Sequence, residues 1–148
     1  MKKYLNFFLL LFIIIQALPA EAVKRITVNP VNIASQLVLK QDSATVASTL
    51  EYYGYTHQPC QDGYTVFKHS DGSVIRFAYQ NSDSKQSYPT IQVHTKSTKP
   101  QIEKILSELN YKKSGNHYEA TTSKYSTYLT KCIFGPGKYV TFDRKKKQ

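Results

Sequence analysis

Apolar residues recur with helical spacing in the second half of the chain. Ile102, Ile105, Leu106 and Leu109 stand at positions i, i+3, i+4 and i+7, so they mark one face of a helix. The preceding segment, residues 98–101, has the form of a capping box with a proline in the first turn. The pattern therefore predicts a helix over residues 99–109, closed by Asn110.

A second apolar series with helical spacing lies in the first half. Val46, Ala47, Leu50 and Tyr53 share one face, and Gly54 follows as a residue suited to the end of a helix. Asp42 and Ser43 are alternative N-cap residues. The sequence predicts a second helix over residues 44–53.

The remaining patterned segments are rich in β-branched and aromatic residues, which is typical of strands. Asp71-Gly72 between two such segments favours a hairpin, and Gly135-Pro136-Gly137 predicts another turn. The predicted strands are residues 35–40, 55–57, 63–69, 73–79, 90–95, 111–122, 124–134 and 138–144.

The order of these elements predicts one α+β domain, residues 23–143, made of two halves. The halves are residues 34–80 and 90–143, joined by a serine-rich linker, residues 81–89. An offset of 56 residues aligns the two helices, and an offset of 65 aligns the hairpins around Gly72 and Gly137. We therefore expect tandem β-α-β-β-type halves whose two helices pack on one face of a shared antiparallel sheet. Chance similarity of two amphipathic helices is the alternative to a duplication.

This tandem order of a helix and antiparallel strands resembles that of the secreted β-lactamase inhibitory proteins. The resemblance covers element order and implies a fold of that general kind. It assigns no functional residue, because no motif of the chain matches one of that family.

The first 22 residues have the layout of a secretory signal peptide. Met1-Lys2-Lys3 is basic, residues 4–15 are apolar except for Asn6, and Ala20-Glu21-Ala22 offers small residues at a cleavage site. The apolar run is shorter than the ~20 residues of a membrane-spanning helix. We expect cleavage after Ala22, with Ala20 as the alternative, and a secreted or periplasmic protein without a transmembrane segment.

Cys60 and Cys132 are the chain's two cysteines. Because export would expose them to an oxidising compartment, the sequence predicts one structural disulfide between them. By closing the loop of residues 60–132, this disulfide would add about 4 kcal/mol of stability in the chain-entropy model. Free thiols and a catalytic cysteine are the alternatives.

The chain of 148 residues carries 20 basic and 10 acidic residues, a net charge of +10. Its 41% hydrophobic content excludes a wholly disordered chain. Four of the cations, Arg144, Lys145, Lys146 and Lys147, lie in a basic C-terminal segment, residues 144–148. They are candidates for contact with a polyanion or an anionic envelope surface, and a solvated tail is the alternative. No pattern indicates specific binding of nucleic acid.

Candidate catalytic chemistry is sparse. The four histidines lack metal-ligand spacing, and His69-Ser70-Asp71 falls in the predicted hairpin turn, where short polar side chains bond the backbone. We therefore expect no cofactor, no metal and no enzymatic activity. A small hydrolase with an unrecognised site is the alternative.

Tyrosine supplies the best candidate for a binding surface. The chain has 12 tyrosines and no tryptophan, and several tyrosines fall on predicted strands. Tyr79 and Tyr128, with Arg76 and Lys131 as charged neighbours, are the candidate binding face for an unknown protein or glycan. The alternative is that tyrosine simply fills pleated surfaces. The sequence predicts a non-catalytic binding or interaction module.

Overall fold

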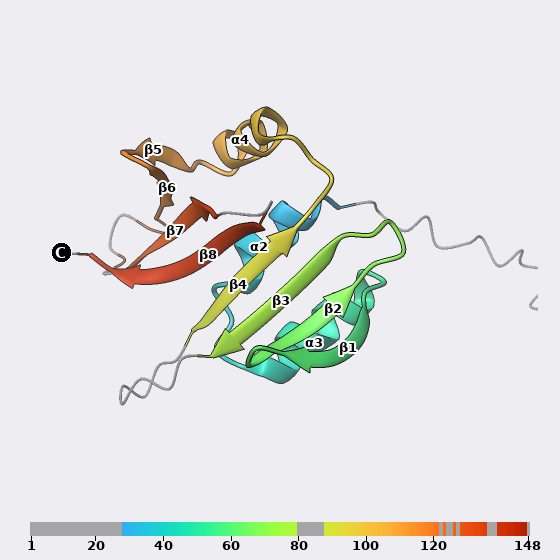
Figure 1. Ribbon diagram of the computed structural model, residues 1–148. Coiled ribbons are helices and arrows are strands. Elements are labelled where there is room, and N and C mark those ends of the chain that lie inside the picture. Colours follow the sequence, from blue (N-terminus) through green and yellow to red (C-terminus); the bar gives the residue numbers. More distant parts are fainter. Residues whose placement is uncertain are drawn as a thin grey trace, which may run out of the picture.

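The computed structural model describes residues 28–79, 88–121, 123, 126, 128–135 and 139–147. The predicted signal peptide and most of the predicted linker lie outside these residues. Figure 1 shows a single antiparallel sheet with helices packed against it. The α+β fold class is therefore confirmed.

Three helices and eight strands make up the described chain. The helices are α2 (Pro30–Leu37), α3 (Ser43–Tyr52) and α4 (Lys99–Glu108). The strands are β1 (Thr56–Gln61), β2 (Tyr64–Lys68), β3 (Val74–Tyr79), β4 (Pro89–His94), β5 (Lys112–Ser114), β6 (His117–Ala120), β7 (Tyr128–Phe134) and β8 (Tyr139–Lys146). Their order across the sheet is β1-β2-β3-β4-β8-β7-β6-β5. No helix in these ranges is long and apolar enough to cross a membrane.

Helices α3 and α4 confirm the two helices that the apolar spacing predicted. The Asp42 carboxylate accepts hydrogen bonds from the first turn of α3, and Gln101 Oε1 accepts one from the Thr98 N–H at 2.8 Å. Both helices are followed by a residue with positive φ, Gly54 at 85° and Asn110 at 62°. Side chains that cap the first turn and left-handed residues past the last turn explain why both helices stop where they do.

The prediction of a strand over residues 35–40 is wrong, because residues 35–37 end helix α2 and residues 38–40 form no strand. The Asn29 side chain accepts from the Val31 N–H at 2.9 Å, and Pro30 occupies the first turn. Six of the eight residues of α2 are buried. Residues 37–39 form a short apolar run, which periodicity alone cannot assign to a strand or a buried helix, whereas the helical spacing of Ile33, Ala34 and Leu37 begins upstream of the predicted strand.

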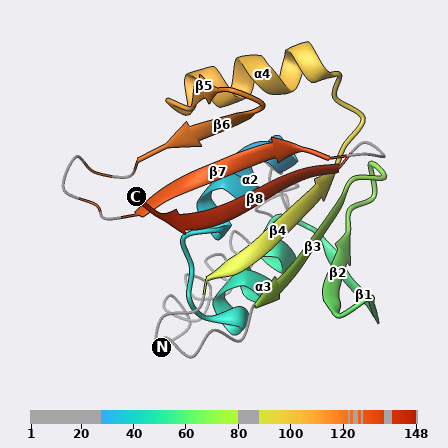
Figure 2. The ribbon, with the colours of Figure 1, turned by 60° about the vertical axis from the view of Figure 1, so that its left-hand side comes forward.

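The helices share one side of the sheet, where α2 is central. Figures 1 and 2 show α2 and α3 behind the strands. Buried side chains of all three helices join those of the sheet in one core: Val31, Ile33, Leu37, Val46, Leu50, Ile102, Leu106, Phe67, Ile75, Phe77, Ile91, Val93, Cys132, Val140 and Phe142. This arrangement differs from the expected pair of helices by the addition of α2.

The predicted β-α-β-β halves are not confirmed. In chain order, α3 is followed by β1 to β4 and α4 by β5 to β8, and the two groups meet where β4 pairs with β8. The segment expected to open the second half, residues 90–95, is thus the last strand of the first group. The hairpin offset of 65 matches β3 with β8, whereas β3 and β7 hold corresponding places in the sheet.

The prediction of a Cys60–Cys132 disulfide is wrong, since both cysteines are free. Cys60 is exposed on the edge strand β1, and Cys132 is buried on β7. Four strands lie between β1 and β7, so the two cysteines are about 24 Å apart at the usual strand spacing. A disulfide needs Cα atoms within about 7 Å. Strand order, which spacing along the chain does not reveal, separates them.

Candidate functional site

The side of the sheet away from the helices is covered by no described helix, and we call it the open face. Cross-strand partners point to the same side of a sheet, so the register identifies its members. Arg76 pairs with Gln92, Gln92 with Thr141, and Thr141 with Ile133, across β3, β4, β8 and β7. Their neighbours along each strand point into the core. The open face is therefore a continuous surface over the middle of the sheet.

Arg76 is held at the centre of an aromatic cluster on the open face. Its guanidinium carbon lies 4.8 Å from the ring centroid of Tyr64 and 4.6 Å from that of Tyr139. Its Nε donates to Gln92 Oε1 at 2.7 Å, and His94 lies 5.5 Å from Tyr139, ring to ring. Four adjacent strands supply these residues, which we call the Arg76 cluster. The two rings and the amide fix the orientation of the guanidinium.

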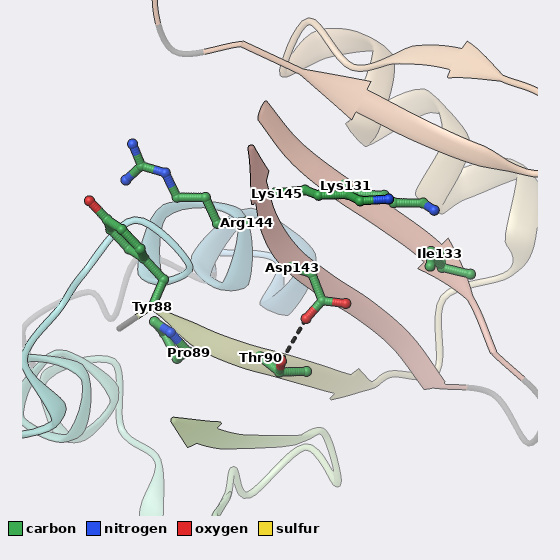
Figure 3. Close-up of a pocket in the computed structure, with 8 residues that line it drawn as sticks. All are labelled: Tyr88, Pro89, Thr90, Lys131, Ile133, Asp143, Arg144 and Lys145. Atoms are coloured by element: carbon green, nitrogen blue, oxygen red, sulfur yellow. Dashed lines mark hydrogen bonds between the residues drawn. The ribbon is translucent and has the colours of Figure 1, made fainter. Parts of the chain in front are cut away.

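A hollow of about 290 Å³ lies beside the ends of β4, β7 and β8, and residues of both sides of the sheet line it. Figure 3 shows its lining residues: Tyr88, Pro89, Thr90, Lys131, Ile133, Asp143, Arg144 and Lys145. Thr90 Oγ1 donates to Asp143 Oδ1 at 2.6 Å. Among the described residues, neither Lys131 nor Lys145 forms an ion pair. The hollow therefore presents two cations that form no ion pair among the described residues, although Lys131 lies opposite Glu119 and Asp143 in the sheet register.

The structure divides the four residues of the candidate binding face between the two sides of the sheet. Arg76 and Lys131 lie on the open face, whereas Tyr79 and Tyr128 lie on the side of the helices. The Tyr79 hydroxyl donates to the Lys40 carbonyl at 3.3 Å, and burial raises the pKa of Tyr79 to about 12. These four side chains do not form one surface. The alternation of β3 and β7 accounts for the division.

The candidate polyanion residues are not a free tail either. Arg144, Lys145 and Lys146 belong to β8, and Arg144 and Lys145 pair with residues of β7. Successive residues of a strand point to opposite sides, so Lys145 reaches the open face and Arg144 the other. Figure 3 shows the Arg144 and Lys145 side chains leaving the strand in different directions. Lys147 follows the strand.

Arg144 also lies between two tyrosines. Its guanidinium carbon is 3.9 Å from the ring centroid of Tyr88 and 5.0 Å from that of Tyr128. Both arginines of the described chain thus contact a pair of tyrosine rings, on opposite sides of the sheet. Only the cluster around Arg76 occupies the middle of the open face.

The histidine, serine and aspartate of the hairpin turn close the turn locally. His69 Nδ1 lies 3.1 Å from Asp71 Oδ1, which accepts at 2.7 Å from both the hydroxyl and the N–H of Ser73. The Ser73 hydroxyl is also 3.0 Å from that of Tyr55, in the core. Burial opposes ionisation of Asp71, but the hydrogen bonds from Ser73 and the hydrogen bond and charge of His69 together outweigh it and hold the pKa of Asp71 below its usual value. No serine hydroxyl here faces the histidine, as a nucleophile would face its base.

Metal ligands do not gather in the structure as described: no three side chains of histidine, cysteine, aspartate or glutamate converge. His117 and Glu119 form a close pair at 2.6 Å on the open face of β6. Two ligands at one point are fewer than the four protein ligands of a structural zinc site.

Tyr64, Gln92, His94 and Tyr139 were missed as site residues by the sequence analysis. The hairpin signal at Asp71-Gly72 predicts that β2 pairs with β3, and this local signal brings Tyr64 near Arg76. Tyr139 reaches the cluster only because β8 pairs with β4, and no local signal predicts that pairing.

Comparison with protein-family models, with curated proteins and with solved structures finds no match to this chain. The function is therefore argued from the geometry of its own residues.

Proposed function

We propose that this protein is a non-catalytic binding module that contacts a partner protein through the open face. The observation that carries the proposal is the Arg76 cluster, a guanidinium held by two tyrosines and an amide at the centre of a sheet face that none of the described helices covers. Arginine and tyrosine are enriched among the residues that dominate protein–protein binding energies. Side chains that are already ordered lose less entropy on binding, so an organised cluster favours tight association.

The export of the protein to the periplasm or the medium is part of this proposal. The layout of residues 1–22 supports it. Intact-mass analysis of the exported fraction, before and after thiol alkylation of the unfolded chain, tests it: we expect a chain that begins at Val23 and carries two alkylatable thiols. A mass that retains residues 1–22 would contradict export with cleavage.

We also propose that the open face was built by duplication of one unit, a helix followed by four strands. The bounds of α3 and α4 differ by 56 residues at both ends. Equivalent backbone hydrogen bonds follow the two helices: the Tyr55 N–H donates to the Leu50 carbonyl at 3.0 Å, and the Tyr111 N–H donates to the Leu106 carbonyl at 2.8 Å. This unit replaces the β-α-β-β unit expected from the sequence.

Site-specific photocrosslinking tests the binding function. A photoreactive benzoylphenylalanine at Thr141, in the middle of the open face, is compared with the same residue at Tyr52, which is 82% exposed on α3. In the producing organism we expect a defined protein adduct from position 141 and none from position 52. Equal adducts from both positions, or an adduct from position 52 alone, would overturn the proposal.

Contact with a polyanion or an anionic envelope surface is the second candidate function. It is favoured by Lys131 and Lys145, which line the hollow without an ion-pair partner in the described chain. Binding to anionic lipid vesicles or heparin would then fall steeply with added salt and weaken in a Lys131→Gln/Lys145→Gln variant. Binding that persists in this variant would contradict a role for the hollow.

A further inference from the structure

We propose that Arg76 is the anchor for a carboxylate of an acidic partner protein, held end-on by its two terminal amino groups. The inference rests on the proposed binding function and adds the chemistry of the partner. It concerns one group at one position of the open face.

Arg76 has hydrogen-bonding capacity that the described chain does not use. Its Nε already donates to Gln92 Oε1 at 2.7 Å, and no described residue accepts a hydrogen bond from its Nη1 or Nη2 groups. These two groups present a pair of parallel donors, which matches the two oxygens of a carboxylate. The half-buried guanidinium thus lacks the partner that its geometry suits.

The packing of the cluster disfavours the other ligands that tyrosine and arginine commonly bind. Sugar rings and nucleobases stack on exposed aromatic faces. Here Tyr64 and Tyr139 each contact the guanidinium of Arg76, at 4.8 and 4.6 Å, so ring surface is already occupied by the cation. The same rings cover the guanidinium, so a ligand reaches it by its N–H edge. A carboxylate is the protein group that fits this edge.

The surface that surrounds Arg76 is positively charged. The open face carries Lys68, Arg76, Lys112, Lys131 and Lys145 against Asp143 and Glu119. Both acids have hydrogen-bond partners, Thr90 and His117 respectively. Residues 88–147 contain twelve basic and four acidic residues, a net charge of +8, whereas residues 28–79 contain three and four, a net charge of −1. Such a surface attracts acidic partners.

A protein, and not an acidic polysaccharide, is the occupant that the face favours. Partly exposed Val74 and Ile133 lie on the same side as Arg76. A surface on which apolar side chains lie among cationic ones is complementary to a protein surface, which carries both apolar and acidic groups.

The test is a peptide titration of the chain that begins at Val23, monitored by NMR. The probes are two capped peptides, one of alternating glutamate and alanine and the other with glutamine in place of glutamate. The readout is the Nε–Hε signal of Arg76, with that of Arg144 as an internal control because Arg144 also lies between two tyrosines. We expect the glutamate peptide at millimolar concentration to shift the Arg76 signal saturably, and the glutamine peptide to leave it unchanged.

Substitution separates the hydrogen-bond fork from the charge alone. Arg76→Lys keeps a cation between the rings but removes the fork, so we expect at least about tenfold weaker binding of the glutamate peptide. Arg144→Lys is the matched control, with unchanged affinity expected. Backbone amide spectra establish that both variants fold.

Several results would overturn the inference. Equal shifts on the open face with both peptides would leave the binding function standing and refute the carboxylate. Shifts at Arg144 and not at Arg76, or none at Arg76 with either peptide, would also refute it. Polygalacturonate that binds Arg76 more tightly than the glutamate peptide would refute a protein as the occupant. The crosslink from position 141 tests the binding function separately.

Discussion

The two sides of the sheet use alternate residues of the same strands for different purposes. On β3, Ile75 and Phe77 are buried under the helices, while Arg76 between them takes part in the cluster of the open face. On β8, Val140 and Phe142 are buried in the core. One side therefore contributes to stability through buried apolar area, and the other presents polar and cationic groups in defined positions. Substitutions on the two sides should separate stability from binding.

The largest expected effect is on the covered side. Phe142→Ala removes a fully buried ring next to Cys132 and Ile91, so we expect a loss of about 3–5 kcal/mol in the free energy of unfolding. Thr141→Ala, one residue earlier and on the open face, should cost less than about 1 kcal/mol. Urea denaturation monitored by tyrosine fluorescence measures both. Equal losses of stability in the two variants would show that Thr141 is also packed in the folded protein, which would contradict an uncovered open face.

A pH-dependent effect on the covered side should come next. Burial raises the pKa of the Cys132 thiol to about 12, from 9.0 for an exposed thiol. The folded state therefore keeps the proton that the unfolded state loses, so the contribution to stability is complete below pH 9 and is lost as pH rises toward 12. Unfolding free energies between pH 8 and 11 should decline less steeply in Cys132→Ala than in the unsubstituted chain.

The exposed Cys60 supplies the control for this slope, since Cys60→Ala should decline as the unsubstituted chain does. Tyr79, whose pKa burial raises to about 12, contributes a further decline in all three proteins. Identical slopes in both cysteine variants would contradict the account. Native-state thiol labelling should modify Cys60 alone, and labelling after unfolding should modify both.

A smaller effect is expected at the start of α2, the central helix of the covered side. Asn29→Ala removes the side-chain oxygen that accepts from the Val31 N–H, which should cost about 1 kcal/mol. Asn29→Asp keeps an acceptor at this position and should retain most of the stability. Thermal or urea unfolding compares the two variants. An equal loss in both would mean that the contact of Asn29 with Ser97 matters more than the cap.

The smallest effect on stability is expected at Arg76. Arg76→Lys keeps a cation near Tyr64 and Tyr139 but removes the Nε–H bond to Gln92, so it should lower the free energy of unfolding by less than about 1 kcal/mol. The same substitution should weaken carboxylate binding at least about tenfold. Urea denaturation and the NMR titration measure the two quantities on one sample. A large loss of stability would make Arg76 a structural residue of the open face.

Local signals predicted the elements whose causes are local. Helices α3 and α4 follow from apolar spacing together with side chains at their first turns. The β2–β3 hairpin follows from Asp71-Gly72, where Gly72 has a φ of 89° that favours glycine, and is confirmed by the pairing of Lys68 with Val74. At α2 the strand prediction followed the short apolar run of residues 37–39, whereas the helical spacing of apolar residues begins upstream of it, at Pro30.

The candidate site was predicted in part. Arg76 and Lys131 were selected from the chain and do lie on the open face. Tyr79 and Tyr128 were selected with them but lie on the opposite side, because period-2 alternation separates them from the cations. Tyr139 lies in a predicted strand, residues 138–144. Its contact with Arg76 depends on the pairing of β4 with β8, whose register partners are 45 residues or more apart in the chain.

Neighbouring residues thus settled the ends of α3 and α4, the hairpin turn and the alternation of each strand, because spacing, capping and backbone sterics act within a few residues. The order of the strands came from packing three helices onto one sheet, which buries apolar residues far apart in the chain. That order places β8 beside β4, which brings Tyr139 to Arg76 and puts residues 144–146 into the sheet. The same order separates Cys60 from Cys132 by four strands. Burial of apolar surface in one shared core is the dominant favourable contribution to folding, so it determines the strand order and with it the distance between the two cysteines.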